Sequence, residues 1–437
     1  MKIGIIGLGF VGLSFASVLG SKGYFVIGAD TDAKKISMIK NGKPPFHEPK
    51  LTETLKEALK GGLSIMTDIS HLVNECELIF ITVGTPQQKN GSIDLTMIKS
   101  VSKKIGDLLA KTTNKPTIVV KSTVIPETTI KVVLPILERN SKKKVGRDFG
   151  LVTNPEFLRE TNAIYDTINP HVIVIGSFDD KFAQKVEKFY SSFIKNVPIV
   201  RTNHQTAEMI KYANNSFLAT KISFINQIAK ICEAVPGTNV DDVAKAIGLD
   251  PRIGPLFLNA GPGYGGSCLP KDVKAIIDFS LRTGVKSPLL NAVELINNEQ
   301  LEWIITIIKK KVGSLKGKRV TILGLAFKPD TDDVRDSVSI KLIELLLKNK
   351  VDIIVHDPKA IENTRSIFGQ KILYAQSLND ALKGSYCAIL MTAWKQYTSI
   401  NNNNLKFMKK PIIIDSRRVL TKKNLDADYY ALGIGQN

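Results

Sequence analysis

The feature that most constrains this chain is a short apolar run that stops at regularly spaced glycines. Residues 2–7 (KIGIIG) are rich in β-branched side chains and predict a buried strand. Gly7, Gly9 and Gly12 then form the pattern GxGxxG, and a helix is expected from about 11 to 22. Glycines at these offsets permit a tight turn and let the backbone approach a pyrophosphate at a helix N-terminus. The sequence therefore predicts a dinucleotide-binding turn; the alternative is a tight turn that binds nothing.

The next apolar run supports that prediction and indicates which dinucleotide is bound. Residues 24–30 (YFVIGAD) read as a second strand that ends on Asp30. A carboxylate at this place can bond a ribose 2′-OH and would repel a 2′-phosphate. Asp30 therefore favours NAD over NADP, although Lys34 and Lys35 follow on the next expected helix.

Apolar runs that alternate with helical stretches predict a mainly parallel sheet in each half of the chain. The further strands expected in the first half are residues 78–83, 117–123, 149–154 and 172–176. From Thr206 to about Glu233 the pattern predicts one long helix. A second strand set is expected at 319–327, 351–358, 387–392 and 411–415, and the polar run 401–404 is expected to be a loop.

The second strand set has a different first turn. It carries only Gly324, followed by Leu325 and Ala326, and lacks GxGxxG. A dinucleotide is therefore not expected there, although a mononucleotide can dock at the carboxyl edge of such a sheet.

Composition narrows the classes of function. The 437 residues carry a formal charge of +19, which fits either an anionic partner or a lysine-rich solvated surface. The basic residues are dispersed, which argues against a nucleic-acid module. No apolar stretch reaches membrane-spanning length. The four widely spaced cysteines indicate neither disulfides nor a metal site, and suit the cytoplasm.

One cysteine differs from the other three in its surroundings. Cys268 lies in the glycine-rich loop 261–272, where the backbone can approach a ligand, and Lys271 and Asp272 follow it. The other three, Cys76, Cys232 and Cys387, lie in apolar segments and are expected to be packing residues. A reachable thiolate can add to an aldehyde, and the hemithioacetal can lose hydride to give a thioester that water hydrolyses.

Candidate bases and polar partners lie in three other segments. Residues 154–160 (NPEFLRE) follow an expected strand end, where ligands gather in such sheets. Lys211 and Asn215 are four residues apart on the long helix and share a face, which is also typical of a solvated helix surface. Thr123 ends an expected strand and can hydrogen-bond a water or a substrate.

Together these motifs resemble the UDP-glucose/GDP-mannose 6-dehydrogenase family over nearly the full length of the chain. The segments that carry the resemblance are GLGFVG (7–12), KSTV (121–124), NPEFLRE (154–160), EMIKYANNSFLATKISFINQIA (208–229), DPRIG (250–254), GYGGSCLPKD (263–272), GLAFKPDTDDVRDS (324–337) and VHDP (355–358). The resemblance implies an α/β fold with two Rossmann-like, doubly wound parallel-sheet domains, joined by a long central helix that helps to form a homodimer. The domains expected are 1–200 for NAD, 201–311 for dimerisation with the cysteine loop, and 312–437 for the sugar-nucleotide.

The resemblance also implies roles. Cys268 is expected to be the nucleophile and Lys211 the base in alcohol oxidation, with Asn215 a donor beside it. The residues expected to order the hydrolytic water are Asp272, Thr123 and either Glu156 or Glu160. Those expected near NAD are Gly7, Gly9, Val11, Gly12, Asp30, Lys35, Thr85, Thr123, Glu160, Lys271 and Arg335.

The substrate side of the site follows from the same likeness. The residues expected to bind the sugar-nucleotide are Glu156, Phe157, Leu158, Arg159, Glu160, Lys211, Asn215, Phe257, Leu258, Asn259, Ala260, Gly261, Gly265 and Lys328. Arg252 resembles a residue that reaches the substrate of the neighbouring subunit.

Two substrates stay open within the family, and two other classes of function compete with it. Leu269 stands where UDP-glucose enzymes often have phenylalanine and GDP-mannose enzymes often have leucine, whereas Tyr264 favours UDP-glucose. Ser267 argues against the UDP-N-acetylhexosamine branch, which usually has histidine there. A nucleotide-binding protein without catalysis is disfavoured because every expected chemical residue is present. A nucleic-acid-binding function rests only on the positive charge.

Overall fold

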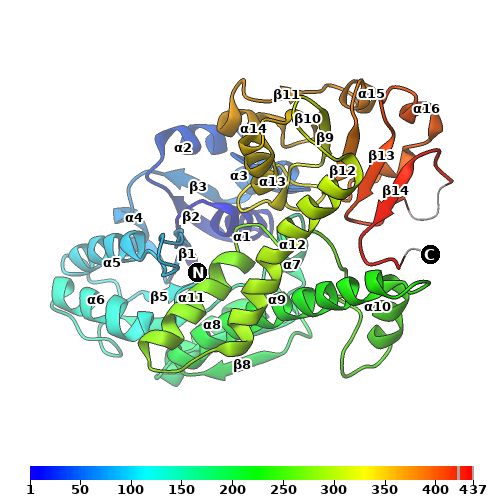
Figure 1. Ribbon diagram of the computed structural model, residues 1–437. Coiled ribbons are helices and arrows are strands. Elements are labelled where there is room, and N and C mark those ends of the chain that lie inside the picture. Colours follow the sequence, from blue (N-terminus) through cyan, green and yellow to red (C-terminus); the bar gives the residue numbers. More distant parts are fainter. Residues whose placement is uncertain (421–423, 436–437) are drawn as a thin grey trace. The chain divides into compact units, whose positions relative to one another are not determined.

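The computed structural model describes residues 1–420 and 424–435. It divides into two compact units, Met1–Asn214 and Asn215–Asn437. Each unit is built around its own parallel sheet, as Figure 1 shows. The expectation of two Rossmann-like sheets with a long central helix is confirmed.

The first unit holds an eight-stranded sheet in the order β3-β2-β1-β4-β5-β6-β7-β8. Its strands are β1 (Lys2–Ile6), β2 (Phe25–Ala29), β3 (Leu63–Met66), β4 (Leu78–Ile81), β5 (Thr117–Val120), β6 (Gly150–Thr153), β7 (Ile173–Gly176) and β8 (Ile199–Thr202). The strands pair in parallel except at β6–β7. The strand order reverses between β1 and β4, and ligands of such sheets bind beside that point, outside the carboxyl ends of the strands.

Helices connect these strands on both faces of the sheet. They are α1 (Phe10–Ser21), α2 (Ala33–Lys40), α3 (Leu51–Gly61), α4 (Ser70–Glu75), α5 (Thr96–Leu109), the π-helical turn η1 (Thr129–Val133), α6 (Leu134–Ser141), α7 (Ala163–Ile168) and α8 (Asp180–Ser191).

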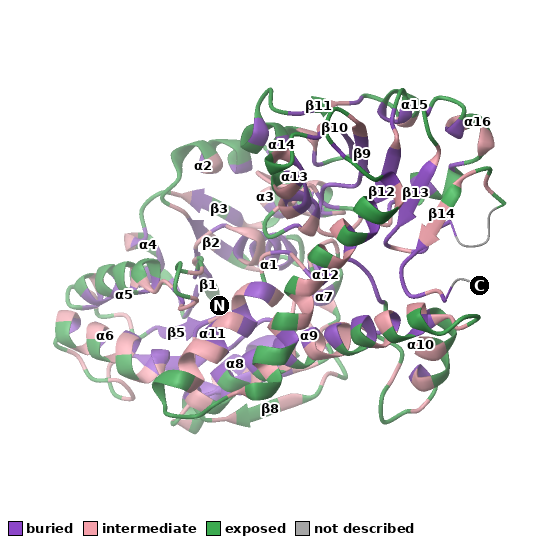
Figure 2. Cartoon of the chain, in the orientation of Figure 1, coloured by how far each residue is buried: buried purple, intermediate pink, exposed green. Residues whose placement is uncertain are grey.

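Burial on both faces explains why the strands are continuous apolar runs. In β4, Leu78 and Phe80 pack into one hydrophobic cluster and Ile79 and Ile81 into another. A parallel sheet covered by helices has no solvated face, so its strands do not alternate apolar with polar residues. Figure 2 shows the same central burial in the strands of both units.

The long helix α9 (His204–Ala234) contains the expected helix 206–233 and crosses the boundary between the units. The second unit continues with α10 (Val240–Gly248), α11 (Leu269–Arg282), α12 (Pro288–Val312), α13 (Val338–Lys348), α14 (Ile361–Phe368), α15 (Leu378–Leu382), the 3-10 turn η2 (Lys395–Ser399) and α16 (Asn402–Leu405). None of the helices in the described residues combines the length and apolar character that crossing a bilayer requires.

The second sheet, within the described residues, has the order β11-β10-β9-β12-β13-β14. Its strands are β9 (Arg319–Leu323), β10 (Asp352–His356), β11 (Leu373–Tyr374), β12 (Cys387–Leu390), β13 (Ile412–Asp415) and β14 (Asp428–Ala431). The four expected strands are confirmed, and each is shorter than its apolar run.

Two kinds of local prediction differ from the structure. The expected loop at 401–404 is wrong, because Asn402–Leu405 form the short helix α16. Asn401 caps it: its side chain accepts the N–H of Asn403, while the side chain of Asn404 accepts the N–H of Asn401. In addition, the pattern did not predict the short strands β3, β8, β11 and β14, whose exposed or polar positions interrupt the apolar signal.

A buried network in the first unit ties α9 to the segment that follows β5. Glu208 accepts the N–H of Thr129 at 2.8 Å, and Thr153 Oγ1 lies 2.9 Å from His204 Nδ1. Glu208 is 2% exposed, and burial raises the pKa of its carboxyl to about 7 despite the hydrogen bonds from Thr129. Ionisation of Glu208 therefore opposes folding.

We expect Glu208→Gln to stabilise the protein at pH 8 and to have little effect at pH 5. The amide oxygen can still accept the N–H of Thr129, whereas the buried charge is gone. The folded-state pKa lies above the usual value, so the folded state binds the extra proton between about pH 4.5 and 7, and stability falls as pH rises through that window. Urea titrations at both pH values should show a gain of about 1–2 kcal/mol at pH 8 only. Equal effects at both pH values would contradict this account.

Candidate active site

The turn between β1 and α1 has the geometry of a pyrophosphate cradle. Gly7 has φ +98°, and Gly9 is the N-cap of α1. A Cβ on Gly12 would lie 1.9 Å from the carbonyl oxygen of Gly7, so only glycine lets the helix start so close to the strand. A Cβ on Gly9 would meet nothing within 4 Å. The space beside Gly9, at a helix N-terminus, therefore suits the pyrophosphate of a dinucleotide.

Asp30 stands at the end of β2, beside this turn. Its carboxylate accepts the N–H of Leu8 and the ammonium of Lys35, each at 2.8 Å. Burial opposes ionisation of Asp30, but the bonds from Lys35 and from backbone N–H groups outweigh it, so its pKa is lowered. The half-buried carboxylate is an acceptor suited to ribose hydroxyls.

The remaining first-unit residues expected near the cofactor also lie at this edge of the sheet. Thr85 follows β4 and donates to the carbonyl of Thr123, which follows β5, at 2.7 Å. Val11 lies in the first turn of α1. The structure thus brings together eight of the predicted residues: Gly7, Gly9, Val11, Gly12, Asp30, Lys35, Thr85 and Thr123. Glu160, also of this unit, lies half-buried in the segment after β6, and its approach to NAD stays a prediction. Lys271 and Arg335 belong to the other unit, and their approach to NAD stays a prediction.

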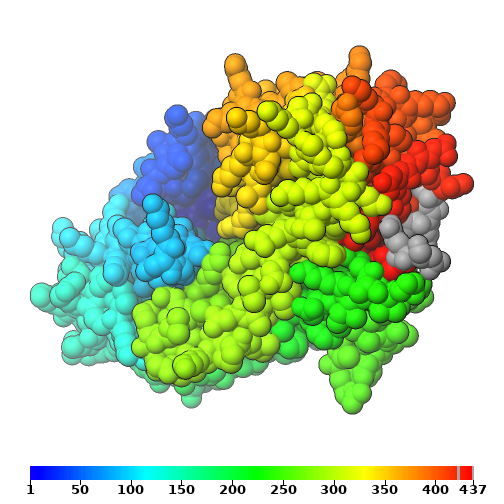
Figure 3. Space-filling model, viewed as in Figure 1, coloured from blue at the N-terminus to red at the C-terminus, as the bar shows by residue number. Residues whose placement is uncertain are grey.

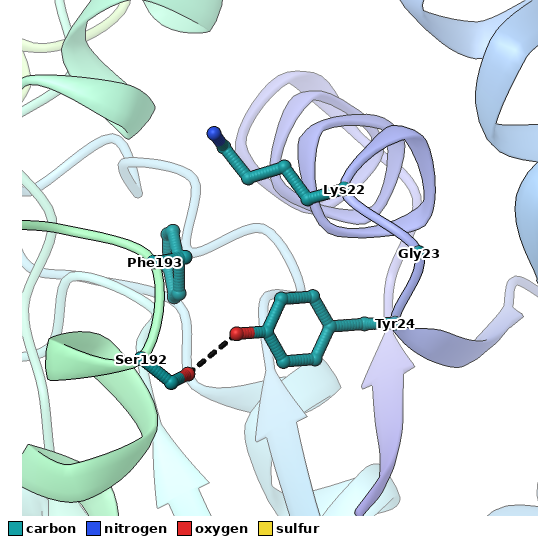
Figure 4. Close-up of a pocket in the computed structure, with 5 residues that line it drawn as sticks. All are labelled: Lys22, Gly23, Tyr24, Ser192 and Phe193. Carbon is teal, nitrogen blue, oxygen red and sulfur yellow. Dashed lines mark hydrogen bonds between the residues drawn. The ribbon is translucent and has the colours of Figure 1, made fainter.

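A small surface pocket lies at the opposite edge of this sheet and is separate from the cradle. It is lined by Lys22, Gly23, Tyr24, Ser192 and Phe193, where α1 and α8 end, and the hydroxyls of Tyr24 and Ser192 are 2.5 Å apart (Figure 4). Because Lys22–Tyr24 precede β2, this pocket faces the amino ends of the strands.

The segment after β6 carries a buried ion pair with α9. Lys211 Nζ lies 3.2 Å from Glu156 Oε1, and the two side chains are 5% and 8% exposed. Glu156 also accepts the N–H of Leu158 at 2.5 Å, and Lys211 Nζ lies 5.3 Å from the ring centre of Phe157. The helix face that includes Lys211 is therefore not a solvated one. The carboxylate of Glu156 compensates the buried charge of Lys211.

Neighbouring contacts hold the same segment in place. Arg159 pairs with Asp166 at 2.6 Å, and Glu48 accepts the N–H groups of Thr161 and Ala163. Glu160 lies half-buried between them. Glu156 is in contact with Lys211.

In the second unit, Cys268 is exposed and caps the N-terminus of α11. A helix N-terminus favours the thiolate form of a cysteine. The other three cysteines are buried, as expected. Burial raises the pKa of the Cys76 thiol to about 12, so it stays protonated.

One turn into α11, Asp272 is 1% exposed and joins Cys268 to α9. Its N–H donates to the carbonyl of Cys268 at 2.9 Å, and its Oδ2 accepts from Asn215 Nδ2 at 2.6 Å. Lys271 pairs with the other carboxylate oxygen. Three of the expected catalytic residues of this unit are thus linked: Cys268, Asp272 and Asn215. Asn215 lies one helical turn after Lys211 on α9.

A cavity of about 560 Å³ lies at the carboxyl edge of the second sheet. Among its lining residues are the predicted Leu258, Asn259, Ala260 and Lys328, and the unpredicted Arg417 and Arg418 that follow β13. Arg418 is fixed by Asp241 and by the carbonyl of Ala260, each at 2.8 Å. Burial and the charge of Arg418 lower the pKa of Arg417 to about 10, which leaves it charged at neutral pH. The cavity is therefore suited to an anion.

The other expected substrate residues surround these elements. Gly261 allows the approach of Arg417, because a Cβ there would lie 2.9 Å from that guanidinium. Gly265 packs against the backbone of Asp336, and Phe257 has φ +66°. Arg252 is highly exposed and paired with Asp250 after α10. Arg417 and Arg418 were not predicted from the sequence as site residues, although two arginines directly after a buried strand indicate an anion site at the carboxyl edge of a sheet.

The cradle, the acidic strand end and the two sheets define an NAD-dependent dehydrogenase with two Rossmann-like domains. Residues 1–194, 205–299 and 321–422 match, in turn, the NAD binding, central and UDP binding domains of the UDP-glucose/GDP-mannose dehydrogenase family. The chain belongs to that family.

Known proteins are similar to this chain over nearly its full length. UDP-glucose 6-dehydrogenase AglM of Haloferax volcanii is 39% identical over 435 residues, which are 99% of this chain and 100% of the relative. UDP-glucose 6-dehydrogenase TuaD of Bacillus subtilis is 38% identical over 98% of this chain and 92% of its own length. A UDP-glucose dehydrogenase from Pyrobaculum islandicum has a structure that matches with a TM-score of 0.93 at 33% identity, over 99% of this chain and 98% of that one.

We expect Gly9→Ala to fold normally and to bind NAD about tenfold more weakly or worse. The added methyl meets no protein atom but fills the cradle in which the pyrophosphate would lie. Calorimetric titration with NAD measures the affinity, and thermal unfolding measures the fold. Gly12→Ala is the contrasting variant, since its methyl collides with Gly7 and should lower stability. Wild-type NAD affinity in Gly9→Ala would refute the assignment of the cradle.

Proposed function

We propose that this chain is a UDP-glucose 6-dehydrogenase that oxidises the C6 alcohol of the sugar to a carboxylate with two NAD and one water. The observation that carries the proposal is the exposed Cys268 at the start of α11, linked through Asp272 to Asn215 on α9. The relatives that bear this name support the choice of UDP-glucose, and the arginine-lined cavity of the second unit suits the phosphates of a nucleotide.

The proposed chemistry has three stages, for which NAD supplies the hydride acceptor. Lys211 takes the proton of the C6 hydroxyl as hydride leaves C6, which gives an aldehyde. The Cys268 thiolate adds to that aldehyde, and the thiohemiacetal loses a second hydride to become a thioester. Water then adds to the thioester carbonyl, the C–S bond breaks, and the carboxylate leaves with the thiolate restored.

The neighbouring polar groups serve the oxyanions and the water. Asn215 donates to the oxygen at C6, and Lys211 stabilises its negative charge. Asp272 orders the hydrolytic water together with Thr123 and one glutamate. We assign that glutamate to Glu156, because its contact with Lys211 places it beside the proposed base, with Glu160 the alternative.

Substrate contacts are proposed for the segment 156–160, the segment 257–261, Gly265 and Lys328, and Arg417 is added to this set. Arg252 is proposed to reach the substrate of the neighbouring subunit. The division into 1–200, 201–311 and 312–437 assigns NAD binding, dimerisation with the cysteine loop, and nucleotide binding to successive segments. We place the enzyme in the cytoplasm, where its cysteines would stay reduced.

GDP-mannose is the second candidate substrate, favoured by Leu269 at the start of α11. Tyr264 favours UDP-glucose, and it is buried where α9, α11 and α12 pack together. The two candidates differ in the nucleotide as well as in the sugar, so a direct comparison separates them.

The wild-type protein is expected to form about two NADH for each UDP-glucose consumed, and none with GDP-mannose. Limiting sugar-nucleotide with excess NAD, followed at 340 nm to completion, measures the yield. Turnover of GDP-mannose alone would move the assignment to the other branch of the family. About one NADH per sugar would end the thioester proposal.

Cys268→Ser should abolish steady-state formation of the acid and lower kcat at least about a thousandfold. The serine hydroxyl is a weaker nucleophile than a thiolate, and the ester it would form is hydrolysed more slowly than a thioester. The matched control is Cys232→Ser, which changes a buried packing cysteine of the same unit and should keep kcat. Full turnover in Cys268→Ser would contradict the nucleophile role.

The homodimer is proposed to form through α9 and the segment after α10. Phe217, Phe224 and Ile231 recur every seven residues on α9 and are 66%, 50% and 52% exposed. The segment that follows α10, which projects from the surface in green in Figure 3, exposes Leu249 and Leu256 at 78% and 70%. Exposed apolar side chains at regular helical spacing are typical of a helix that packs on a partner.

Phe224→Asp is expected to shift the protein from dimer to monomer, since a charge would be buried at the centre of that contact. Light scattering coupled to gel filtration measures the mass. Phe407→Asp serves as control, because Phe407 is 46% exposed at a turn of the second unit outside these segments. A dimer that survives the change at Phe224 would exclude this face of α9.

A further inference from the structure

One peptide group beside the arginine-lined cavity is held on both sides by buried side chains. It joins Ala260 to Gly261, at the end of the segment 257–261. The N–H of Gly261 donates to Asn226 Oδ1 on α9 at 2.8 Å, and the carbonyl of Ala260 accepts from Arg418 Nη2 at 2.8 Å. Asn226 and Arg418 are 0% and 8% exposed. Because these groups are buried, a bond lost here is not readily replaced by one to water.

The asparagine at position 226 is retained at a cost to the fold. Its nitrogen Nδ2 is buried without a hydrogen-bond partner among the residues that the structure describes. A buried donor without a partner is unfavourable, and an apolar side chain at this position would avoid it. The reason for an asparagine is therefore its oxygen, which accepts the N–H of Gly261.

Arg418 joins the same peptide to two other segments of the second unit. Its Nε donates to Asp241 Oδ1 at 2.8 Å, and its Nη1 donates to the carbonyl of Leu432 at 3.4 Å. Asp241 lies in the first turn of α10, and Leu432 directly follows β14. A guanidinium presents its donors in fixed directions, so Arg418 sets the positions of these segments relative to Ala260.

The two neighbouring arginines have different surroundings. The charge of Arg418 is compensated by the carboxylate of Asp241, whereas Nε of Arg417 donates to the carbonyl of Met391 at 2.9 Å. A Cβ on Gly261 would lie 2.9 Å from Nη1 of Arg417, so Arg417 lies directly against the held peptide. The arrangement leaves Arg417 for an anionic ligand and gives Arg418 to the protein.

The rest of the segment shows what the held peptide positions. Phe257 has φ +66°, a conformation that bulky side chains rarely adopt and that persists only where surrounding contacts enforce it. Leu258 and Ala260 are buried in one hydrophobic cluster with residues of α9. Asn259 lies between them, is exposed and lines the cavity. The fixed peptide thus determines how Asn259 is presented.

We infer that Asn226 and Arg418 are positioning residues that clamp the Ala260–Gly261 peptide and so hold Asn259 and Arg417 ready for the substrate nucleotide. The inference rests on the proposed function, because the ligand is taken to be the nucleotide of UDP-glucose. A segment that is fixed before binding loses little conformational freedom on binding, which raises affinity. Loss of the clamp should therefore weaken nucleotide binding without removing any group proposed for the chemistry.

The test compares Asn226→Ala and Arg418→Met with wild type, by steady-state kinetics with UDP-glucose and by calorimetric titration with UDP. Each variant should raise KM and the Kd for UDP about tenfold and keep kcat within about threefold, because the nucleotide is bound alike in the ground state and the transition state. Unchanged KM and Kd in either variant would overturn the inference.

Arg418→Lys separates position from charge. It keeps the positive charge, but one ammonium cannot reproduce the three bonds of the guanidinium, so its affinity for UDP should be as low as that of Arg418→Met. Wild-type affinity in Arg418→Lys would mean that charge alone matters, and the positioning role would be wrong.

The double variant Asn226→Ala/Arg418→Met tests whether the two side chains act on one peptide. Coupled residues are not additive, so the double variant should lose little more affinity than the weaker-binding single variant, about tenfold rather than about a hundredfold. A loss of about a hundredfold would mean that the two residues act independently, which contradicts a single clamp.

Two measurements distinguish this role from a loss of fold. NAD affinity should stay at the wild-type value in every variant, because the pyrophosphate cradle belongs to the other unit. Arg319→Met is the matched control: Arg319 pairs with Asp352 at 2.8 Å at the start of β9, on the amino edge of the same sheet, and its KM and UDP affinity should match wild type. A lower melting temperature with unchanged KM in the clamp variants would show that Asn226 and Arg418 serve only the fold.

The outcomes also separate the inference from the proposed function. If wild type neither oxidises UDP-glucose nor binds UDP, the proposed function fails. If wild type is active and the clamp variants bind UDP as wild type does, the inference alone fails.

Discussion

The interaction on which the rest of the site depends is the buried ion pair between Lys211 and Glu156. Neither charge can lie in a protein interior alone, so their contact fixes the start of α9 against the end of β6. Asn215 lies one turn after Lys211 on α9. Asn215 in turn bonds Asp272, the residue one turn after Cys268. The same helix thus carries Lys211, the proposed base, and Asn215, the donor proposed to act beside it.

The two sheets show how similar strand topology can serve different ligands. In both sheets, an aspartate just after the second strand of the unit accepts a backbone N–H from the turn after the first strand. Asp30, after β2, accepts the N–H of Leu8, and Asp357, after β10, accepts the N–H of Leu325. Asp30 stays half-buried and can accept more bonds, whereas Asp357 is buried and also accepts from the indole of Trp394. Because the Asp357 carboxylate already has these donors and the turn lacks GxGxxG, the expectation of no dinucleotide in the second unit stays a prediction. Arg417 and Arg418, which follow β13, line the cavity of that unit.

The positively charged residues of the chain fall into two groups, exposed ones and buried ones. Many of its lysines are exposed and paired with neighbouring carboxylates, as at Lys131 and Glu127, and such pairs contribute little to stability. The cations that bear on the proposed chemistry are the buried Lys211 and the half-buried Arg417. These are held by carbonyls, aromatic rings or one carboxylate, and an anionic ligand would complete their neutralisation.

The sequence by itself determined the fold class and the glycine turn after β1, and it distinguished the exposed Cys268 from the three buried cysteines. Continuous apolar runs with glycines between them can bury both faces only in a helix-covered parallel sheet, and Gly12 is required by a contact that forms within one strand and one helix. Short edge strands such as β8 and β14 were not predictable, because their exposed positions lack an apolar pattern. The helix at Asn402–Leu405 was missed because its caps outweigh the poor helix propensity of asparagine.

Only the tertiary structure decided which polar residues meet. Sequence spacing places Lys211 and Asn215 on one helix face but does not say whether that face is buried. It cannot bring Glu156 to Lys211, Asn215 to Asp272, or Arg417 to the cavity beside Leu258, since these residues lie far apart in the sequence, 57 positions in the case of Asn215 and Asp272. The physical reason is that a polar side chain in isolation is satisfied by water. Its partner is chosen only when folding removes that water and leaves the nearest charge or dipole to replace it.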